Sequence, residues 1–174
     1  MDDRELVQRA RGNDPDALHQ LVDRHAADMY ATAAFLVGNR EEANDVVQET
    51  LLGMIRALPS FEGRSSFKTW LWGILIRQAA RSRRKRTPSL GEMPEGVAGR
   101  SGSADARMDI EAALAKLGPE HRQILVLREF EGMSYADIAA ALALPQGTVE
   151  SRLYRARQEL KRYLAAYGRQ EERP

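Results

Sequence analysis

The stretch Ser134–Leu160, SYADIAAALALPQGTVESRLYRARQEL, predicts two helices joined by a tight turn. Apolar residues recur at helical spacing in both halves, first at Tyr135, Ile138, Ala139 and Leu142 and then at Val149, Leu153, Ala156 and Leu160. Ser134 with Asp137 predicts an N-terminal cap for the first helix, and Thr148, after Pro145, is an alternative cap for the second. With its apolar side buried, the second helix turns outward Glu150, Ser151, Tyr154, Arg155 and Gln158.

A helix-turn-helix presents a face of this kind to the major groove of DNA. The alternative interpretation is a surface hairpin of two helices whose arginines are only solvated. The motif favours DNA binding over that alternative, and the rest of the chain has to decide between them.

Composition limits the classes of protein that remain. The 174 residues suffice for one medium domain or two small ones. No apolar run reaches the length of a membrane span, and the N-terminus lacks the apolar core of a signal peptide. Cysteine is absent, which excludes disulfides, thiol nucleophiles and thiolate metal sites. We therefore expect a soluble cytoplasmic protein without membrane insertion.

The formal net charge of +1 conceals a segregated pattern. Residues 61–90 carry eight basic groups and one acidic group, and residues 145–174 carry seven and four. The segments before and between these two blocks are acidic. Two separate basic blocks indicate two contacts with a polyanion, and the acidic surface remains for other partners.

Glycine and proline lie between the periodic segments, and no run is typical of a β-strand. We expect an all-α fold with helices at 3–12, 15–37, 40–58, 67–86, 109–117, 119–130, 134–142 and 146–166. Residues 87–108 are rich in Pro, Gly and Ser and lack a hydrophobic period, which predicts a flexible linker. The chain then divides into two small helical domains, 1–86 and 109–168, with a tail at 169–174.

The first basic block combines a loop, Ser60–Ser66, with a helix that carries both tryptophans. Aromatic rings beside arginines suit single-stranded nucleic acid, because bases stack on rings while guanidinium groups follow the phosphates. Alternatively, the tryptophans are buried in the hydrophobic core. At least one of them, Trp70 in particular, fits a core position better than a position that stacks on a base.

The segment before that loop has a different character. Val47, Leu51, Ile55 and Leu58 form an apolar stripe that we expect to point inward. The other side then shows an acidic and polar face with one leucine, made of Asp45, Gln48, Glu49 and Leu52. A protein partner with a basic surface would use such a face, whereas the simpler alternative is a solvated amphipathic helix.

At this point the chain resembles a known family. DVVQETLLGMIRAL (45–58) with FEGRSSFKTWLWGILIRQAARSRRKR (61–86) resembles region two of bacterial RNA polymerase sigma factors, and residues 117–160 resemble their region four. The short length, with only a linker between the two, is similar to the extracytoplasmic-function group. The resemblance implies a promoter-recognition subunit, not an enzyme, with no cofactor. Its implied partners are core RNA polymerase (the β′ clamp helices and the β flap), promoter DNA and an anti-sigma factor.

The resemblance also implies roles for residues of this sequence. The β′ clamp helices would be bound by Asp45, Gln48, Glu49 and Leu52. The −10 element, with a flipped non-template base captured in the loop, would be read by Phe61, Arg64, Ser65, Lys68, Trp70, Arg77, Arg81 and Arg84. The −35 element would be read by Gly147, Thr148, Glu150, Ser151, Arg152, Tyr154 and Arg155. Arg155 is the best candidate for a base-edge contact, while Arg152 and Arg157 are expected to hold phosphates.

Four positions depart from the family pattern. Arg77 and Arg81 stand where asparagine and an acidic or polar residue are frequent, and both add positive charge to the −10 face. Glu150 stands where many relatives carry Lys or Arg, and a carboxylate there can accept from cytosine N4. Ala143 replaces a frequent turn glycine, so the turn either avoids positive φ or tolerates strain.

Two other functions compete with this interpretation. A helix-turn-helix regulator that acts without polymerase would leave the Asp45–Leu52 face and the aromatic–arginine segment without a role. A metal enzyme would need ligands, but His19 and His25 are six residues apart and lie on different faces of one helix. We therefore expect no catalytic residue and no metal site.

Overall fold

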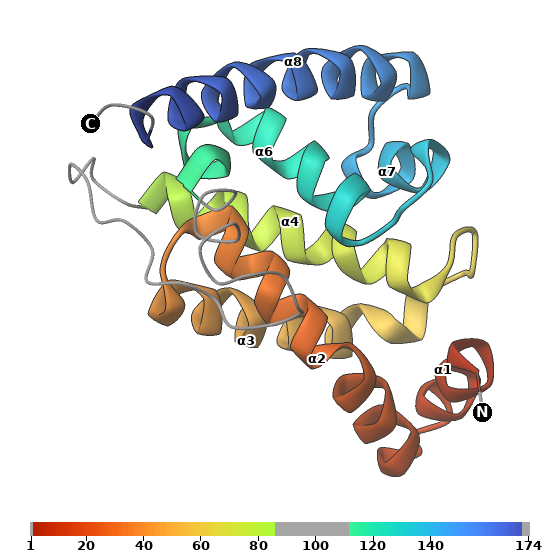
Figure 1. Ribbon diagram of the computed structural model, residues 1–174. Coiled ribbons are helices and arrows are strands. Elements are labelled where there is room, and N and C mark those ends of the chain that lie inside the picture. The colour runs from red at the N-terminus through yellow and green to blue at the C-terminus, as the bar shows by residue number, and fades with distance from the viewer. Residues whose placement is uncertain (1, 86–111, 172–174) are drawn as a thin grey trace.

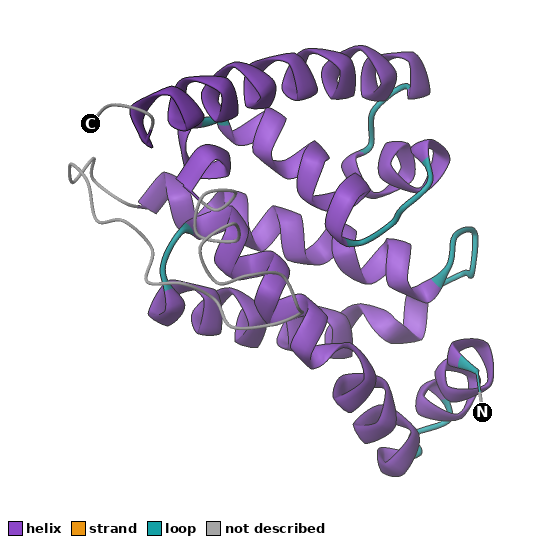
Figure 2. Cartoon of the chain, in the orientation of Figure 1, coloured by secondary structure: helices purple, strands orange, loops and turns teal. Residues whose placement is uncertain are grey.

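The computed structural model describes residues 2–85 and 112–171, and within these ranges the chain is helical with no strand (Figures 1 and 2). The elements are α1 (Asp3–Arg11), α2 (Pro15–Val37), α3 (Arg40–Ala57), a short 3-10 turn η1 (Leu58–Ser60), α4 (Phe67–Lys85), α6 (Pro119–Leu125), a π-helical turn η2 (Val126–Phe130), α7 (Tyr135–Leu142) and α8 (Gln146–Glu171). The all-α prediction is confirmed. The expected linker, 87–108, lies outside the described residues.

Local sequence signals account for most helix boundaries. Asp2 forms a complete capping box with Glu5 at the start of α1, and Asp14 caps α2 immediately before Pro15. Gly38 ends α2 in the left-handed region at φ 83°, a conformation that glycine adopts without steric cost. Asn39 then accepts from the amide of Glu42 and starts α3. Side-chain caps and one glycine thus place the joints of the N-terminal domain, α1–α4.

Helix α3 is rotated relative to the sequence expectation. Its fully buried positions are Ala43, Val46, Thr50 and Met54. Thr50 donates its hydroxyl to the carbonyl oxygen of Val46 at 2.7 Å, so a polar side chain is buried there with its hydrogen bond satisfied. Of the expected inward stripe, Leu58 is buried, Val47 and Leu51 are half-buried, and Ile55 is 47% exposed. The prediction that Ile55 points inward is wrong.

Helix α4 is buried around most of its circumference because it lies between two layers. Helices α2 and α3 cover one side, and α7 of the C-terminal domain (α6–α8) covers the other (Figure 1). The two domains consequently share one continuous apolar core. Gly73 lies at the closest approach, where an added Cβ would come within 3.1 Å of the Ala141 carbonyl oxygen. A side chain at this position would therefore press against the backbone of α7, and glycine lets the two helices lie this close without that strain.

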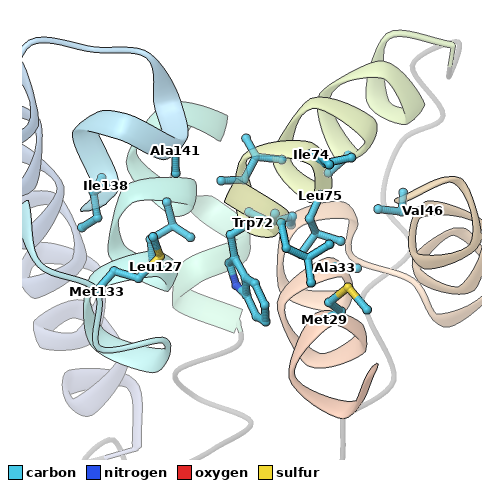
Figure 3. Packing of buried hydrophobic residues seen from close by; sticks show 14 of the residues in the cluster. Met29, Ala33, Val46, Trp72, Ile74, Leu75, Leu127, Met133, Ile138 and Ala141 are labelled. Carbon is cyan, nitrogen blue, oxygen red and sulfur yellow. The ribbon is translucent and has the colours of Figure 1, made fainter. Parts of the chain in front are cut away.

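Trp72 fills the centre of this shared core and is fully buried (Figure 3). Leu127, Met133 and Ile138 of the C-terminal domain lie to one side of it, and Met29 and Leu75 of the N-terminal domain lie to the other. Trp70, which we expected to be the core tryptophan, is only half-buried. The sequence favoured the wrong one of the two because it does not show that α7 packs on α4.

Trp72→Ala is expected to lower the free energy of unfolding by about 3–5 kcal/mol, because it leaves a large cavity in the shared core. Trp72→Phe should cost much less. The indole Nε1 of Trp72 is buried without a hydrogen-bond partner, so phenylalanine removes an unsatisfied donor along with some volume. Urea unfolding of the three proteins measures the difference, and equal losses for the two variants would contradict this account.

The helix-turn-helix has the predicted elements with two local differences. Ser134 caps α7 by accepting from the amide of Asp137, as expected. Ala143 ends α7 at φ 52° and ψ 46°, so the turn keeps the left-handed conformation at the steric cost that glycine would avoid. Helix α8 begins at Gln146, directly after Pro145, so Thr148 lies within the first turn and is not its cap. The helix continues to Glu171, beyond the expected end at 166, since no proline interrupts it.

Candidate nucleic-acid and partner interfaces

The outward face of α8 has the composition that the sequence predicts. The side chains of Glu150, Ser151, Tyr154, Arg155 and Gln158 are all exposed, and Tyr154 reaches 67%. The opposite side, formed by Val149, Leu153 and Ala156, is at most 1% exposed and packs on the core. Because the underside is anchored, this face is held in one orientation toward solvent.

At the start of α8 the Thr148 amide already donates to the carbonyl oxygen of Pro145 at 2.9 Å, and Glu150 presents a positioned carboxylate one turn further on. Gly147 is exposed and Thr148 is half-buried in the first turn, where the helix dipole favours an anion such as phosphate. Gln146 donates its side-chain amide to Glu150 at 3.2 Å, which orients the Glu150 carboxylate along the exposed face. This turn therefore combines a phosphate-attracting end with one acceptor.

The two arginines that we expected to hold phosphates are already paired within the protein. Arg152 lies 3.3 Å from Glu120, and its side chain is 28% exposed. Arg157 donates two hydrogen bonds to Glu129, which raise its pKa above the ordinary value of arginine. Both therefore tie α8 to the α6–η2 segment. Arg155, which makes no hydrogen bond or ion pair with another described residue, is the arginine of this face with an unoccupied guanidinium.

The loop between η1 and α4 carries an aromatic cluster. The Phe61 ring lies 4.8 Å from Trp70 and 6.2 Å from Phe67, measured between centroids. Arg64 is strongly exposed and forms an ion pair with Glu62, while Ser65 is half-buried. Phe61 and Phe67 are nearly buried, so the cluster forms a floor with the polar loop above it.

Lys68 and Thr69, at the start of α4, contact the C-terminal domain. Lys68 Nζ lies 2.9 Å from a carboxylate oxygen of Glu131, whose side chain is only 7% exposed. Thr32 donates to the other carboxylate oxygen of Glu131 at 2.5 Å. Thr69 donates to Asp137 at 2.9 Å, and the hydrogen bonds from Ser134 and Thr69 lower the pKa of Asp137. Lys68, predicted to bind the −10 element, is thus occupied by a partner from the other domain.

Three of the predicted −10 arginines lie further along α4 than Trp70. Arg77, Arg81 and Arg84 are exposed along α4. Arg81 and Lys85 line a cleft of about 470 Å³ whose opposite wall is α3, with Asp45, Gln48 and Glu49. Arg81 therefore lies beside the acidic face of α3 rather than beside the aromatic cluster. Arg83 is half-buried and donates to the carbonyl oxygen of Leu36, which gives it a structural contact.

The acidic face of α3 is exposed as a unit. Asp45, Gln48, Glu49 and Leu52 all point to solvent, with Leu52 45% exposed. Ile55 lies on the same side one turn further on, which adds a second apolar side chain that the sequence analysis had assigned to the core. This face of α3 therefore combines two exposed apolar side chains with two carboxylates.

A further cleft, of about 650 Å³, lies between α1 and the loop at 61–67. Arg4, Gln8 and Arg11 line it from α1, and Phe61, Ser65 and Phe67 line it from the loop. No site residue was predicted on α1. The spacing of residues 4, 8 and 11 places them on one face of a helix, but only the tertiary structure brings this face beside the loop.

Comparison with known proteins gives the family. The family model described as Sigma-70 region 2 matches residues 21–88, and that described as Sigma-70, region 4 matches residues 107–160. The RNA polymerase sigma-H factor of Pseudomonas aeruginosa is 34% identical over 180 residues, which are 93% of this chain and 93% of that protein. The chain belongs to the extracytoplasmic-function (ECF) group of the sigma-70 family.

Other ECF relatives agree with this assignment. The ECF RNA polymerase sigma-E factor of Escherichia coli is 32% identical over 91% of this chain and 92% of its own length. The ECF sigma factor SigE of Mycolicibacterium smegmatis is 34% identical over 86% of this chain, which spans 62% of that relative. Sigma factors direct promoter-specific initiation of transcription by RNA polymerase and are initiation factors, not classical enzymes.

Two solved structures share the fold of this ECF chain. CnrH, in complex with the cytosolic domain of CnrY, superposes with a TM-score of 0.76 at 29% identity over 94% of this chain and 97% of its own. The sigma factor RpoE of Bartonella quintana, in complex with the anti-sigma factor NepR, gives 0.71 at 30% identity over 84% and 96%. Because the CnrH match includes both domains, their mutual placement is also similar.

Within 2–85 and 112–171, no group of three or more His, Cys, Asp or Glu side chains is arranged to hold a metal ion. In the same part of the chain, no helix combines the length and apolar character needed to cross a membrane.

Proposed function

We propose that this ECF factor docks on core RNA polymerase through α3 and reads a promoter with two separate surfaces. The observation that carries the proposal is that one chain exposes an acidic, leucine-bearing face on α3 and an anchored reading face on α8. A DNA-binding regulator that acts alone would need only the second. The docking residues are Asp45, Gln48, Glu49 and Leu52, and Ile55 adjoins them.

The −10 element is assigned to the loop and the start of α4. Phe61, Trp70 and Phe67 supply aromatic surface close to the polar loop, an arrangement suited to an unstacked base. Extracting one base from the stack costs a few kcal/mol, which contacts in a pocket can offset. Arg64 and Ser65 lie at the rim, while Arg77, Arg81 and Arg84 continue the positive charge along α4 toward the phosphates.

The −35 element is assigned to α8. Gly147 and Thr148 lie in the first turn, where the helix dipole favours a phosphate, and Ser151, Tyr154 and Arg155 lie on the outward face. Glu150 is held as an acceptor, which suits the exocyclic amine of cytosine or adenine. Arg152 is bound to Glu120, so its contribution is to fix the helix rather than to select a base.

Reading both elements at once requires the two domains to separate. A compact chain of this length has a radius of gyration of about 16 Å, hence a diameter of about 40 Å. The −10 and −35 elements lie about 25 base pairs apart, or about 85 Å along the DNA axis at about 3.4 Å per base pair. The contacts of Lys68 and Thr69 with the C-terminal domain must therefore break on the promoter. We infer that the arrangement in which α4 packs against α7, here called the closed arrangement, is the form in which the protein is held off DNA.

The two solved structures that share this fold suggest what holds α4 against α7. Both are complexes with a second protein, and NepR is an anti-sigma factor. We infer that a cytoplasmic partner of the anti-sigma class binds this chain in its closed arrangement. Release of the partner would then permit α4 and α7 to separate.

Arg155→Ala is expected to reduce discrimination at one or two base pairs of the −35 element by about tenfold, because a bidentate arginine–guanine contact contributes roughly 1–3 kcal/mol. Transcription in vitro with core polymerase, on a library of promoters randomised in the −35 element, measures the base profile. Arg152→Ala is the matched control, since it removes an arginine one turn away that is bound to Glu120. Identical profiles for the two variants would overturn the assignment of the reading face.

A further inference from the structure

The cleft between α1 and the loop has a mixed lining, and only its loop side has a role in the proposed function. Val7, Phe61 and Phe67 form its apolar floor, and these side chains are 4–9% exposed. Polar side chains from α1 stand on one side and the loop backbone at Gly63 stands on the other. Its volume of about 650 Å³ falls within the range of sites that bind small organic ligands.

Most of the charged groups around this cleft already have partners. Asp2 is used by the capping box of α1, and Asp3 binds Arg24 at 2.6 Å and His25 at 2.9 Å. Glu62 is paired with Arg64. The charges that line the cleft are thus largely neutralised by neighbours.

Arg11 also has a partner, and that partner belongs to η1, directly before the loop. Its guanidinium donates to the carbonyl oxygen of Pro59 at 3.2 Å, which ties the end of α1 to η1. Arg11 therefore sets the width of the cleft rather than its specificity, and it is a positioning residue.

Two polar lining residues of α1, Arg4 and Gln8, remain to be considered. Both line the cleft, both are exposed, and neither makes a side-chain hydrogen bond or ion pair with another described residue. They lie four residues apart, so they project from the same face of α1 toward the cleft. Arg4 offers a permanent positive charge, and Gln8 offers a hydrogen-bond donor and an acceptor in one planar amide group.

These two groups match the parts of a nucleotide that the aromatic floor leaves unbound. The floor provides apolar contact for a flat base, a side-chain amide can donate to and accept from its edge, and a guanidinium binds the adjoining phosphate. We propose that α1 forms the second wall of a site for one unstacked nucleotide of single-stranded DNA, with Gln8 contacting the base edge and Arg4 the phosphate. The inference rests on the proposed function of the loop and extends it to α1.

The proposal is tested with the complete holoenzyme on a promoter library randomised across the −10 element. Gln8→Ala is expected to reduce discrimination at one position of that element by about tenfold. Gln8→Glu should shift the preference there toward adenine and cytosine, whose exocyclic amines can donate to a carboxylate. Gln20→Glu, an exposed glutamine on α2 outside the cleft, is the matched control and should leave the profile unchanged.

Arg4→Ala provides an independent measurement with a different expected result. It should weaken open complexes on all sequences to a similar degree and reduce the salt dependence of binding by about one phosphate contact. A base-specific effect of Arg4→Ala would reverse the two roles and overturn the assignment.

The outcomes separate this proposal from the function on which it rests. If wild-type holoenzyme initiates at promoters that core polymerase alone ignores, the function stands. Unchanged −10 profiles for both Gln8 variants, or an equal loss on every sequence, would then overturn only the role of α1. If wild-type holoenzyme shows no promoter preference, the proposed function itself fails.

Discussion

Asp45→Lys combined with Glu49→Lys is expected to lower the affinity for core RNA polymerase by at least about a hundredfold, because placing like charges against a basic partner surface costs several kcal/mol. Both carboxylates lie on the exposed side of α3, while the buried side of the helix remains unchanged. The variant should therefore unfold at nearly the wild-type temperature. Titration of labelled sigma factor with core polymerase measures the affinity, and circular dichroism checks the fold.

The matched control places the same charge change on another helix. Asp23→Lys with Asp28→Lys on α2 alters the net charge equally and lies outside the α3 face. This control should bind core polymerase normally. Normal affinity of the α3 variant, or an equal loss in both variants, would contradict docking through α3.

A disulfide between cysteines placed at Thr69 and Asp137 is expected to abolish transcription from promoters that need both elements. These two side chains already touch, with 2.9 Å between their oxygens, and they join α4 to α7 across the domain boundary. The native chain contains no cysteine, so the introduced pair has no competitor. Oxidised protein should be locked closed and inactive, whereas reduction should restore initiation to the level of the untreated double variant.

The single variants Thr69→Cys and Asp137→Cys, treated with the same oxidant, separate locking from side effects of the substitutions. Each should keep its activity, since it cannot form the intramolecular bond. Full activity of the oxidised double variant, with the disulfide demonstrated by mobility on a gel, would show that initiation does not require the domains to separate.

The sequence was a sufficient guide for the buried and exposed faces of α8 and for the cap of α7, although not for the cap or the end of α8. Val149, Leu153 and Ala156 repeat at the period of a helix and are all buried, so the opposite face follows from geometry alone. The cap at Ser134 is equally local, because its side chain accepts from an amide three residues away. Features determined by neighbours within one or two turns could be predicted correctly.

Helix α3 illustrates a partial success. The acidic side was correctly expected to face solvent, since carboxylates are costly to bury without partners. The apolar residues gave two possible stripes, however, and the one that contains Ile55 is not the buried one. Periodicity fixes the spacing of a stripe, whereas the choice between adjacent stripes depends on which neighbouring helices are present.

The sequence therefore determined the helices, their joints, the family and the two exposed faces, because these follow from helical periodicity, capping and charge. Only the tertiary structure decided that Trp72 rather than Trp70 fills the core, that Lys68 is bound to Glu131, and that Arg4 and Gln8 stand over the loop. These contacts join residues far apart in the chain. They depend on the packing of α7 against α4 and of α1 against the loop, which no local pattern encodes.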